Sequence, residues 1–252
     1  MGIIFVILTT FLTLVIVAVV AFIIWAGSAR KPQIEALQAM ESNDLVDVKT
    51  GRWLVFCPKE KDPDVGFILY PGARVDARAY SPAAQAIAAK GYLVVIVPMP
   101  LNLAGFAIKR ASAVINAFPH IVHWAIGGHS HGGAMASIFA YKNPATVKGL
   151  VLWSSYPASK YNSSAEDLAA ASIYETLDGR SVMKSIDAYR NRLPTHTRWT
   201  PIEGGCHAQF GWYGLQKNEN IPTISHEEQQ EIITTATLDF LAQVEKGETR
   251  RV

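Results

Sequence analysis

The sequence predicts an α/β fold, a mostly parallel doubly wound sheet preceded by one transmembrane helix. An uncharged apolar run occupies residues 2–27. From residue 51 onward, short apolar runs alternate with helical patterns. The run at residues 92–97 is apolar on both faces, as is typical of a buried parallel strand. Strands that alternate with helices form mostly parallel sheets covered on both sides.

The first segment, residues 1–27, is long enough to cross a bilayer. As a helix rising ~1.5 Å per residue, the apolar run reaches roughly 37 Å, whereas the hydrocarbon core is about 30 Å thick. Trp25 stands where an interfacial aromatic residue is expected. All 23 basic and 21 acidic residues lie at or after Arg30, so the rest of the chain has the charge content of a globular protein. We therefore expect a single-pass membrane protein.

A cleaved signal peptide is the alternative, because residues 26–29 are all small. The apolar run is, however, about twice the usual ~7–15 residues, and no basic residue precedes it. Arg30 and Lys31 follow the run directly, and the positive-inside rule then favours a cytoplasmic domain. The opposite topology, with the domain exported across the membrane, is the alternative.

Residues 28–50 predict a juxtamembrane connector with a short helix at 34–37, and residues 51–252 predict one catalytic domain. The predicted strands are apolar runs bounded by turn residues, at 52–57, 65–70, 92–97, 123–128, 147–153, 170–174 and 197–202. The predicted helices lie at 81–90, 104–118, 132–141, 183–191 and 227–244. Sheets of this kind place their chemistry at the carboxyl ends of the strands, so reactive side chains are expected directly after strands.

Composition excludes several functions. The formal charge of +2 is spread thinly, without a basic stripe, which argues against nucleic-acid binding. Cys57 and Cys206 have no zinc or redox spacing, and whether they pair is left open. The His129-x-His131 pair has the spacing of two metal ligands but lacks a third, so we expect no metal and no cofactor.

The motif Gly128-His129-Ser130-His131-Gly132 lies between a predicted strand and a predicted helix. It matches the G-x-S-x-G nucleophile elbow, in which a serine occupies a strained turn. A β-carbon at either glycine would clash with the close backbone around it. The amino terminus of the following helix also places partial positive charge where an anionic intermediate would form. Ser130 is therefore the predicted nucleophile.

Beyond the anchor, the chain resembles the α/β-hydrolase superfamily, and more narrowly its small, lidless hydrolase fold 5 branch, which is related to dienelactone hydrolases. The segments that carry this resemblance are the elbow and residues 66–72, 97–104, 172–174, 178–179 and 204–211. The resemblance implies an α/β-hydrolase fold and a catalytic triad in the order Ser, Asp, His. One departure is His131, where such proteins often have leucine.

A serine hydroxyl needs a base to remove its proton, and seven histidines compete for that role. His129 and His131 flank the serine on a tight turn and should point away from it. His207 follows the last predicted strand in a glycine-containing loop, which fits the triad order of the superfamily. We therefore predict His207 as the base.

The acid that orients the histidine should follow the strand after Trp153. Asp178 fits that loop and is the predicted acid, while Glu175, at the end of the strand, is the alternative. Backbone amides would form the oxyanion hole. The residue after the nucleophile is His131, and the superfamily pattern indicates Ala73 as the second donor.

These residues predict a serine hydrolase, carboxylesterase-like, that cleaves a carboxylic ester or related acyl bond through an acyl-enzyme. About fifteen residues separate Trp153 from the next strand, which leaves little room for a cap domain. We expect a small-molecule or lipid-like acyl substrate and contact with the membrane through the N-terminal helix. An acyltransferase that uses the same triad, or a non-catalytic binding protein, is the alternative.

Overall fold

The strands form one sheet with the order β1-β2-β4-β3-β5-β6-β7-β8 in the computed structural model, which describes residues 2–165, 167–177, 182–217 and 219–247. Strands β1 and β2, and β2 and β4, pair antiparallel, and every other neighbouring pair is parallel. The strands are β1 (Val46–Thr50), β2 (Leu54–Pro58), β3 (Val65–Tyr70), β4 (Leu93–Ile96), β5 (His123–His129), β6 (Val147–Trp153), β7 (Ala169–Glu175) and β8 (Arg198–Ile202). This topology confirms the predicted fold class.

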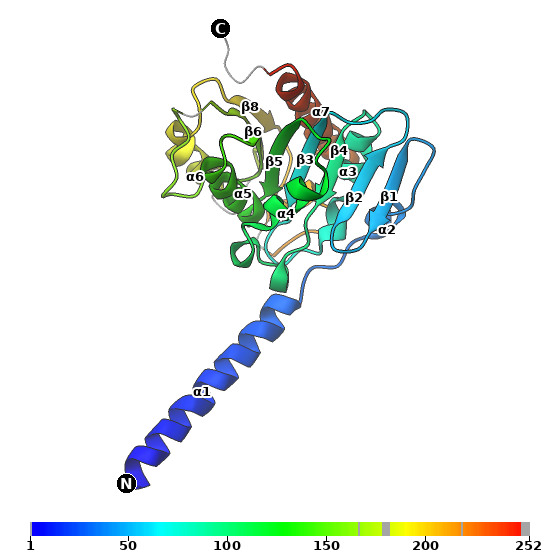
Figure 1. The fold of residues 1–252 in the computed structure, drawn as a ribbon. Coiled ribbons are helices and arrows are strands. Elements are labelled where there is room, and N and C mark those ends of the chain that lie inside the picture. The colour runs from blue at the N-terminus through cyan, green and yellow to red at the C-terminus, as the bar shows by residue number, and fades with distance from the viewer. Residues whose placement is uncertain (1, 166, 178–181, 218, 248–252) are drawn as a thin grey trace.

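Helices cover both faces of the sheet (Figure 1). On one face α3 and α7 pack against side chains such as Phe67 and Val151, and on the other α4 and α5 pack against Ile68 and Leu150. The α-helices are α1 (Gly2–Gly27), α2 (Ile34–Gln38), α3 (Ser81–Ala88), α4 (Arg110–Ala117), α5 (His131–Lys142), α6 (Val182–Tyr189) and α7 (His226–Glu245). Short 3₁₀ turns are η1 (Ala77–Tyr80), η2 (Pro100–Asn102), η3 (Ala104–Phe106), η4 (Arg190–Arg192) and η5 (Ala208–Phe210).

Strand β1 lies within residues 28–50, which the sequence predicted as a connector. It pairs with β2 at the border of the sheet, and only Val46 is fully buried there. Asp47 and Lys49 alternate with the valines and form an ion pair of 3.2 Å on the outward side. Charged residues are usual on an edge strand, and they conceal its apolar pattern.

The helix expected at residues 104–118 is interrupted. It forms η3 and then α4, because the backbone at Ala107 leaves the helical region. The buried Tyr70 hydroxyl donates to the Ile108 carbonyl (2.6 Å) and accepts from the Ala111 amide (3.0 Å). Tyr70 thus satisfies backbone groups around the start of α4.

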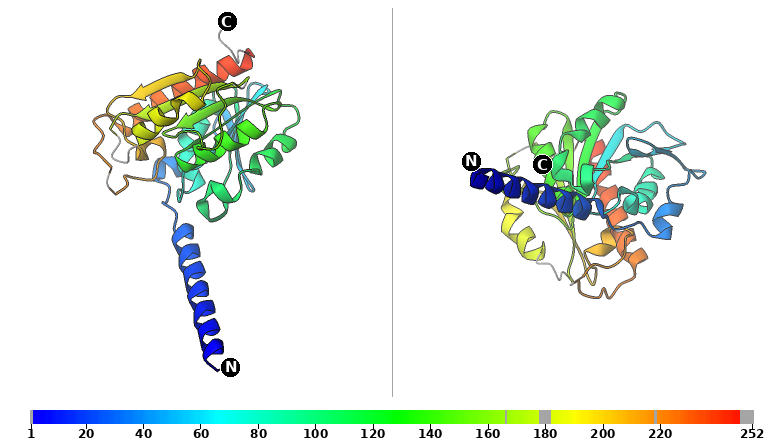
Figure 2. Two further views of the ribbon diagram at one scale, coloured as in Figure 1. Left: turned by 90° about the vertical axis from the view of Figure 1, so that its left-hand side faces the viewer. Right: turned by 90° about the horizontal axis from the view of Figure 1, so that it is seen from below.

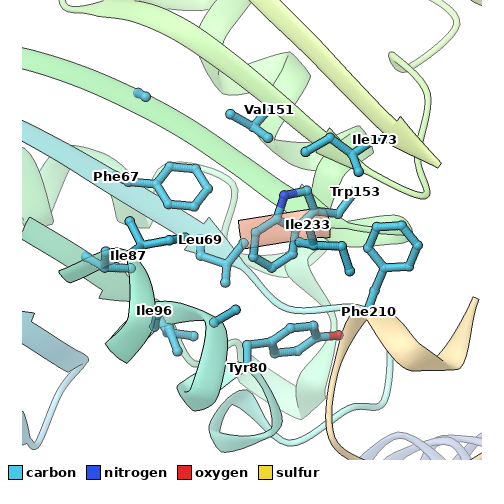
Figure 3. Close-up of a cluster of buried hydrophobic side chains, with 14 of the residues drawn as sticks. Phe67, Leu69, Tyr80, Ile87, Ile96, Val151, Trp153, Ile173, Phe210 and Ile233 are labelled. Atoms are coloured by element: carbon cyan, nitrogen blue, oxygen red, sulfur yellow. The ribbon is translucent and has the colours of Figure 1, made fainter. Parts of the chain in front are cut away.

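One face of the sheet buries a cluster that supports the carboxyl ends of the strands (Figure 3). Trp153, at the end of β6, is fully buried and donates through its indole N–H to the Thr237 hydroxyl at 3.2 Å. Phe210 and Tyr80 belong to the same cluster. Burying one such side chain contributes about 1.5–3 kcal/mol, so the cluster holds these strand ends firmly.

Helix α1 extends away from one end of the domain (Figures 1 and 2). Of its residues, only Ala26 is buried. It is long and apolar enough to cross a membrane, by length and composition. The following chain joins the domain through a parallel bridge between Arg30 and Val75.

Candidate active site

The carboxyl ends of β5, β6, β7 and β8 bring four polar residues to one edge of the sheet. Ser130 follows β5, Ser154 follows β6, Glu175 ends β7, and His207 lies in the loop after β8. The predicted nucleophile and base are therefore at the same edge, as expected for an open α/β sheet.

Ser130 occupies the strained turn that the motif predicts. Its φ and ψ are 52° and −123°, a backbone conformation that non-glycine residues rarely adopt. Such a residue costs on the order of 1–3 kcal/mol and persists only where its surroundings enforce it. The Ser130 amide donates to the Trp153 carbonyl (3.0 Å), and the Ser130 carbonyl accepts from the Ser155 hydroxyl (2.7 Å). These contacts to the end of β6 fix the turn.

The glycines of the motif are required by close backbone contacts. A β-carbon at Gly132 would lie 2.2 Å from the Tyr70 carbonyl oxygen and 2.3 Å from that of Pro71. A β-carbon at Gly128 would lie 2.5 Å from the Gly132 carbonyl carbon. All three distances are below any real van der Waals contact, so only glycine allows α5 to begin directly beneath the serine.

His207 is 3% exposed and is held by two oxygen atoms through its Nδ1. Nδ1 lies 2.6 Å from the Ser154 Oγ and 3.2 Å from Glu175 Oε1. The Ser154 hydroxyl itself donates to Glu175 Oε1 at 2.8 Å, so its oxygen is left to accept from the histidine. This network places a proton on Nδ1 and leaves the Nε2 lone pair as the basic site.

The acid of this network is Glu175, which is 1% exposed. Asp178, the predicted acid, lies outside the described residues. The structure instead brings the alternative carboxylate to His207. Glu175 is the last residue of β7, so its position depends on the sheet itself.

Residues next to Ser130 and residues bonded to its backbone connect it to His207. Ser154, which contacts His207, lies between the two residues that hydrogen-bond to the Ser130 backbone, Trp153 and Ser155. The ring of His129, directly before the serine, has its centroid 4.4 Å from that of His207.

His129 is fully buried among aromatic side chains. Its ring stacks on Phe210 at 5.5 Å between centroids and 6° between planes. Its Nδ1 lies 2.9 Å from the Tyr80 hydroxyl, which also accepts from the Gly72 amide at 3.0 Å. Burial raises the pKa of Tyr80 well above its usual range, so the hydroxyl stays protonated. His129 thus links the His207 loop to the loop after β3.

The two predicted oxyanion donors come from two different segments. His131 begins α5, and Ala73 lies in the loop after β3. On either side of Ala73, the Gly72 amide donates to the Tyr80 hydroxyl and the Arg74 amide donates to the Asn102 carbonyl (2.8 Å). In the part of the chain that the structure describes, neither the Ala73 nor the His131 amide donates a hydrogen bond. Both amides are thus available to a developing oxyanion.

Sequence reasoning missed Ser154. It directly follows Trp153 at the end of β6 and has a φ of 43°, so two neighbouring strands end in strained serines. The rule that chemistry follows strands could have identified it.

Cys206 directly precedes His207 in the loop after β8, whereas Cys57 lies in β2. Cys57 and Cys206 are both free thiols, and burial raises the pKa of Cys206 to about 11. Among the described residues, no group of three or more His, Cys, Asp or Glu side chains is arranged to hold a metal ion.

The family model for the α/β hydrolase family matches residues 66–231, which include Ser130, Glu175 and His207. The chain belongs to the α/β hydrolase family. Curated protein sequences give no match. The fold of this α/β hydrolase is similar to that of a dienelactone hydrolase from Anabaena variabilis, with a TM-score of 0.58 and 12% identity over 77% of this chain and 98% of that one.

Two further solved structures share the fold. A ferulic acid esterase from Streptomyces cinnamoneus has a TM-score of 0.58 and 14% identity over 74% of this chain and 68% of that one. A predicted CIB-like hydrolase from Thermoplasma acidophilum has a TM-score of 0.57 and 14% identity over 78% of this chain and 98% of that one. At these identities the likeness establishes the α/β hydrolase fold.

Proposed function

We propose that this α/β hydrolase is a serine hydrolase that cleaves a carboxylic ester or related acyl bond. The observation that supports this most is the network on His207 Nδ1, at 3.2 Å from Glu175 and at the same sheet edge as the Ser130 elbow. The names of two structural neighbours, a dienelactone hydrolase and a ferulic acid esterase, also denote cleavage of esters.

The reaction follows from the roles of these groups. Ser130 Oγ attacks the carbonyl carbon while His207 Nε2 takes the hydroxyl proton, and Glu175 stabilises the resulting imidazolium. The Ala73 and His131 amides bind the oxyanion of the tetrahedral intermediate. Its collapse expels the alcohol, which takes the proton from His207, and leaves an acyl-serine. Water, deprotonated by His207, then attacks the acyl-serine, and release of the acid restores Ser130.

We propose further that α1 anchors the protein in a membrane. The apolar stretch of α1 is not buried in the domain, unlike the core helix of a soluble protein. The Arg74 side chain donates to the Trp25 carbonyl at 2.8 Å, so the domain contacts the end of the helix, which supports its retention. Resistance of the protein to carbonate extraction from membranes, together with an intact N-terminus by mass spectrometry, tests the anchor.

Fluorophosphonate labelling of the full-length protein tests the catalytic proposal. The wild type should label and should hydrolyse p-nitrophenyl butyrate, whereas Ser130→Ala should do neither, with a loss in kcat of at least about 10³-fold. Ser112→Ala, an exposed serine on α4, is the matched control and should behave as the wild type. Equal labelling of the wild type and Ser130→Ala would refute the proposal.

A further inference from the structure

The last turn of α1 docks on the loop that carries Ala73. The Arg74 guanidinium donates from Nε to the Trp25 carbonyl (2.8 Å) and from Nη2 to the Ser28 hydroxyl (2.9 Å). The guanidinium also lies over the Trp25 ring, 4.5 Å from its centroid. Arg74 directly follows Ala73, so one proposed oxyanion donor is one residue away from the end of the apolar helix.

A second loop connects α1 to the other oxyanion donor. Phe106 meets Phe22 of α1 edge to face, with centroids 6.2 Å apart, and Phe106 is still 59% exposed. The preceding residue, Gly105, lies against the ring of His131. A β-carbon added at Gly105 would be only 3.3 Å from His131 Nε2. Asn102 of the same loop donates to the Ala26 carbonyl at 3.2 Å. This chain of contacts runs from the helix to the residue after Ser130.

The contacts of these loops with α1 define the orientation of the candidate site relative to the helix. Both follow carboxyl ends of strands, β3 and β4, and a third loop, after β8, accepts a hydrogen bond from the Gln33 amide through the Trp212 carbonyl (2.8 Å). The carboxyl edge of the sheet, where Ser130 and His207 lie, is thus the edge to which α1 is attached (Figures 1 and 2). In a membrane, α1 would bring this edge to the bilayer surface.

Phe22 lies about 4.5 Å further along the helix than Trp25, at 1.5 Å of rise per residue. With Trp25 at the interface, Phe106 reaches the level of the acyl chains. Lys31 and Lys109 are exposed near the same loops, where cations attract anionic headgroups. The surface around the site therefore combines an apolar tip with positive charge, as membrane-contacting surfaces do.

We propose that the mouth of the active site is held against the bilayer, and that its substrates are acyl esters of membrane lipids, which reach Ser130 beside Phe106 without leaving the membrane. This inference rests on the proposed serine hydrolase function. An ester in the bilayer keeps its acyl chain in an apolar environment until it meets the serine, whereas a site facing away from the membrane would require its extraction into water.

The test uses the full-length protein in vesicles of three parts phosphatidylcholine to one part phosphatidylglycerol. Two fluorogenic esters are compared, methylumbelliferyl oleate, which dissolves in the bilayer, and methylumbelliferyl acetate, which is in water. The measured quantity is the ratio of their turnover rates. Phe106→Asp should lower the oleate-to-acetate ratio about tenfold, because a charged side chain is excluded from the acyl region. Val122→Asp replaces an apolar residue of similar exposure (65%) just before β5, at the opposite edge of the sheet, and should leave the ratio unchanged.

A second variant separates the domain from the helix without altering the loops. Insertion of a ten-residue Gly-Ser linker between Gly27 and Ser28 should also lower the oleate-to-acetate ratio. The same linker inserted within the turn at residues 59–64, before β3, should leave that ratio unchanged. An unchanged ratio in both Phe106→Asp and the linker variant would overturn the inference, provided that Ser130→Ala is inactive on both esters. Full activity of Ser130→Ala would instead overturn the proposed function.

Discussion

The two halves of the candidate site are built in different ways. On the nucleophile side, β5, the turn and α5 are consecutive in the chain, and backbone contacts of Gly128 and Gly132 fix Ser130. On the acid–base side, Ser154, Glu175 and His207 come from the ends of three strands, and side-chain hydrogen bonds join them. The first half depends on steric exclusion of any β-carbon, and the second on a buried polar network. The two halves should therefore fail differently when mutated.

The largest expected effect is on the acid–base side. Glu175→Gln keeps the size of the side chain but removes the charge that, in the proposed mechanism, stabilises the His207 imidazolium, so kcat/KM for p-nitrophenyl butyrate should fall by about 10³–10⁴-fold, with the fold retained. Asp178→Asn is the matched comparison and should lower it by less than about tenfold. A greater loss in Asp178→Asn than in Glu175→Gln would assign the acid to Asp178.

Gly132→Ala tests the nucleophile side. The new methyl group would lie within 2.3 Å of two backbone carbonyl oxygens that cannot move independently of β3, so the free energy of unfolding should fall by about 3–5 kcal/mol. Gly51→Ala, where an added β-carbon meets nothing within 4 Å, is the control and should change it by less than about 0.5 kcal/mol. Urea denaturation followed by tryptophan fluorescence measures both, and equal stability of the two variants would contradict the steric account.

A pH effect should follow from His226, which supports the segment after His207. The His226 ring stacks on Trp212 with centroids 3.8 Å apart, and burial lowers its pKa from 6.5 to about 4. The unfolded chain therefore binds more protons between these values, so the free energy of unfolding should fall as the pH decreases from about 6.5 to about 4. His226→Phe keeps a stacked ring without a titrating group, and its loss over this interval should be smaller by about 2 kcal/mol. Parallel pH profiles of the two proteins would exclude this role for His226.

The smallest expected effect is that of Ser154→Ala. Its hydroxyl donates to Glu175 and accepts from His207, but Glu175 Oε1 can still accept from Nδ1 directly. We expect kcat to fall about tenfold, equivalent to about 1.4 kcal/mol, with little change in KM. Ser155→Ala, which removes a hydrogen bond to the Ser130 carbonyl instead, allows the two halves of the site to be compared at neighbouring positions.

The same division explains what the sequence could predict. The elbow is local, so five consecutive residues predict Ser130 and the glycines around it. His207 was predictable because it follows the last strand. Glu175 could be placed only as an alternative to Asp178, because the choice depends on where β7 ends relative to β8. The burial of His129 and the hydrogen bond between His207 and Ser154 depend on pairings between distant segments, which no local pattern encodes.

The edge strand β1 shows a second reason for such differences. Its alternation is only five residues long and is concealed by Asp47 and Lys49, whereas the central strands β3 and β6 are apolar on both faces and were predicted with their observed bounds. Burial on both faces thus makes a strand easy to recognise from its sequence.

The position of α7 over the sheet has a consequence for synthesis of the chain on the ribosome. Helix α1 is translated first, and α7 is the last helix described. Side chains of α7, among them Ile233 and Phe240, cover the same face of the sheet as Val151 and Phe67. Until α7 is synthesised, α3 alone covers that face, and the part that α7 buries, with the Trp153 indole that bonds to Thr237 of α7, is open to solvent. A nascent chain therefore carries its complete elbow motif well before the cluster beneath the strand ends is closed, and the geometry around Ser130 is completed only in the last stage of folding.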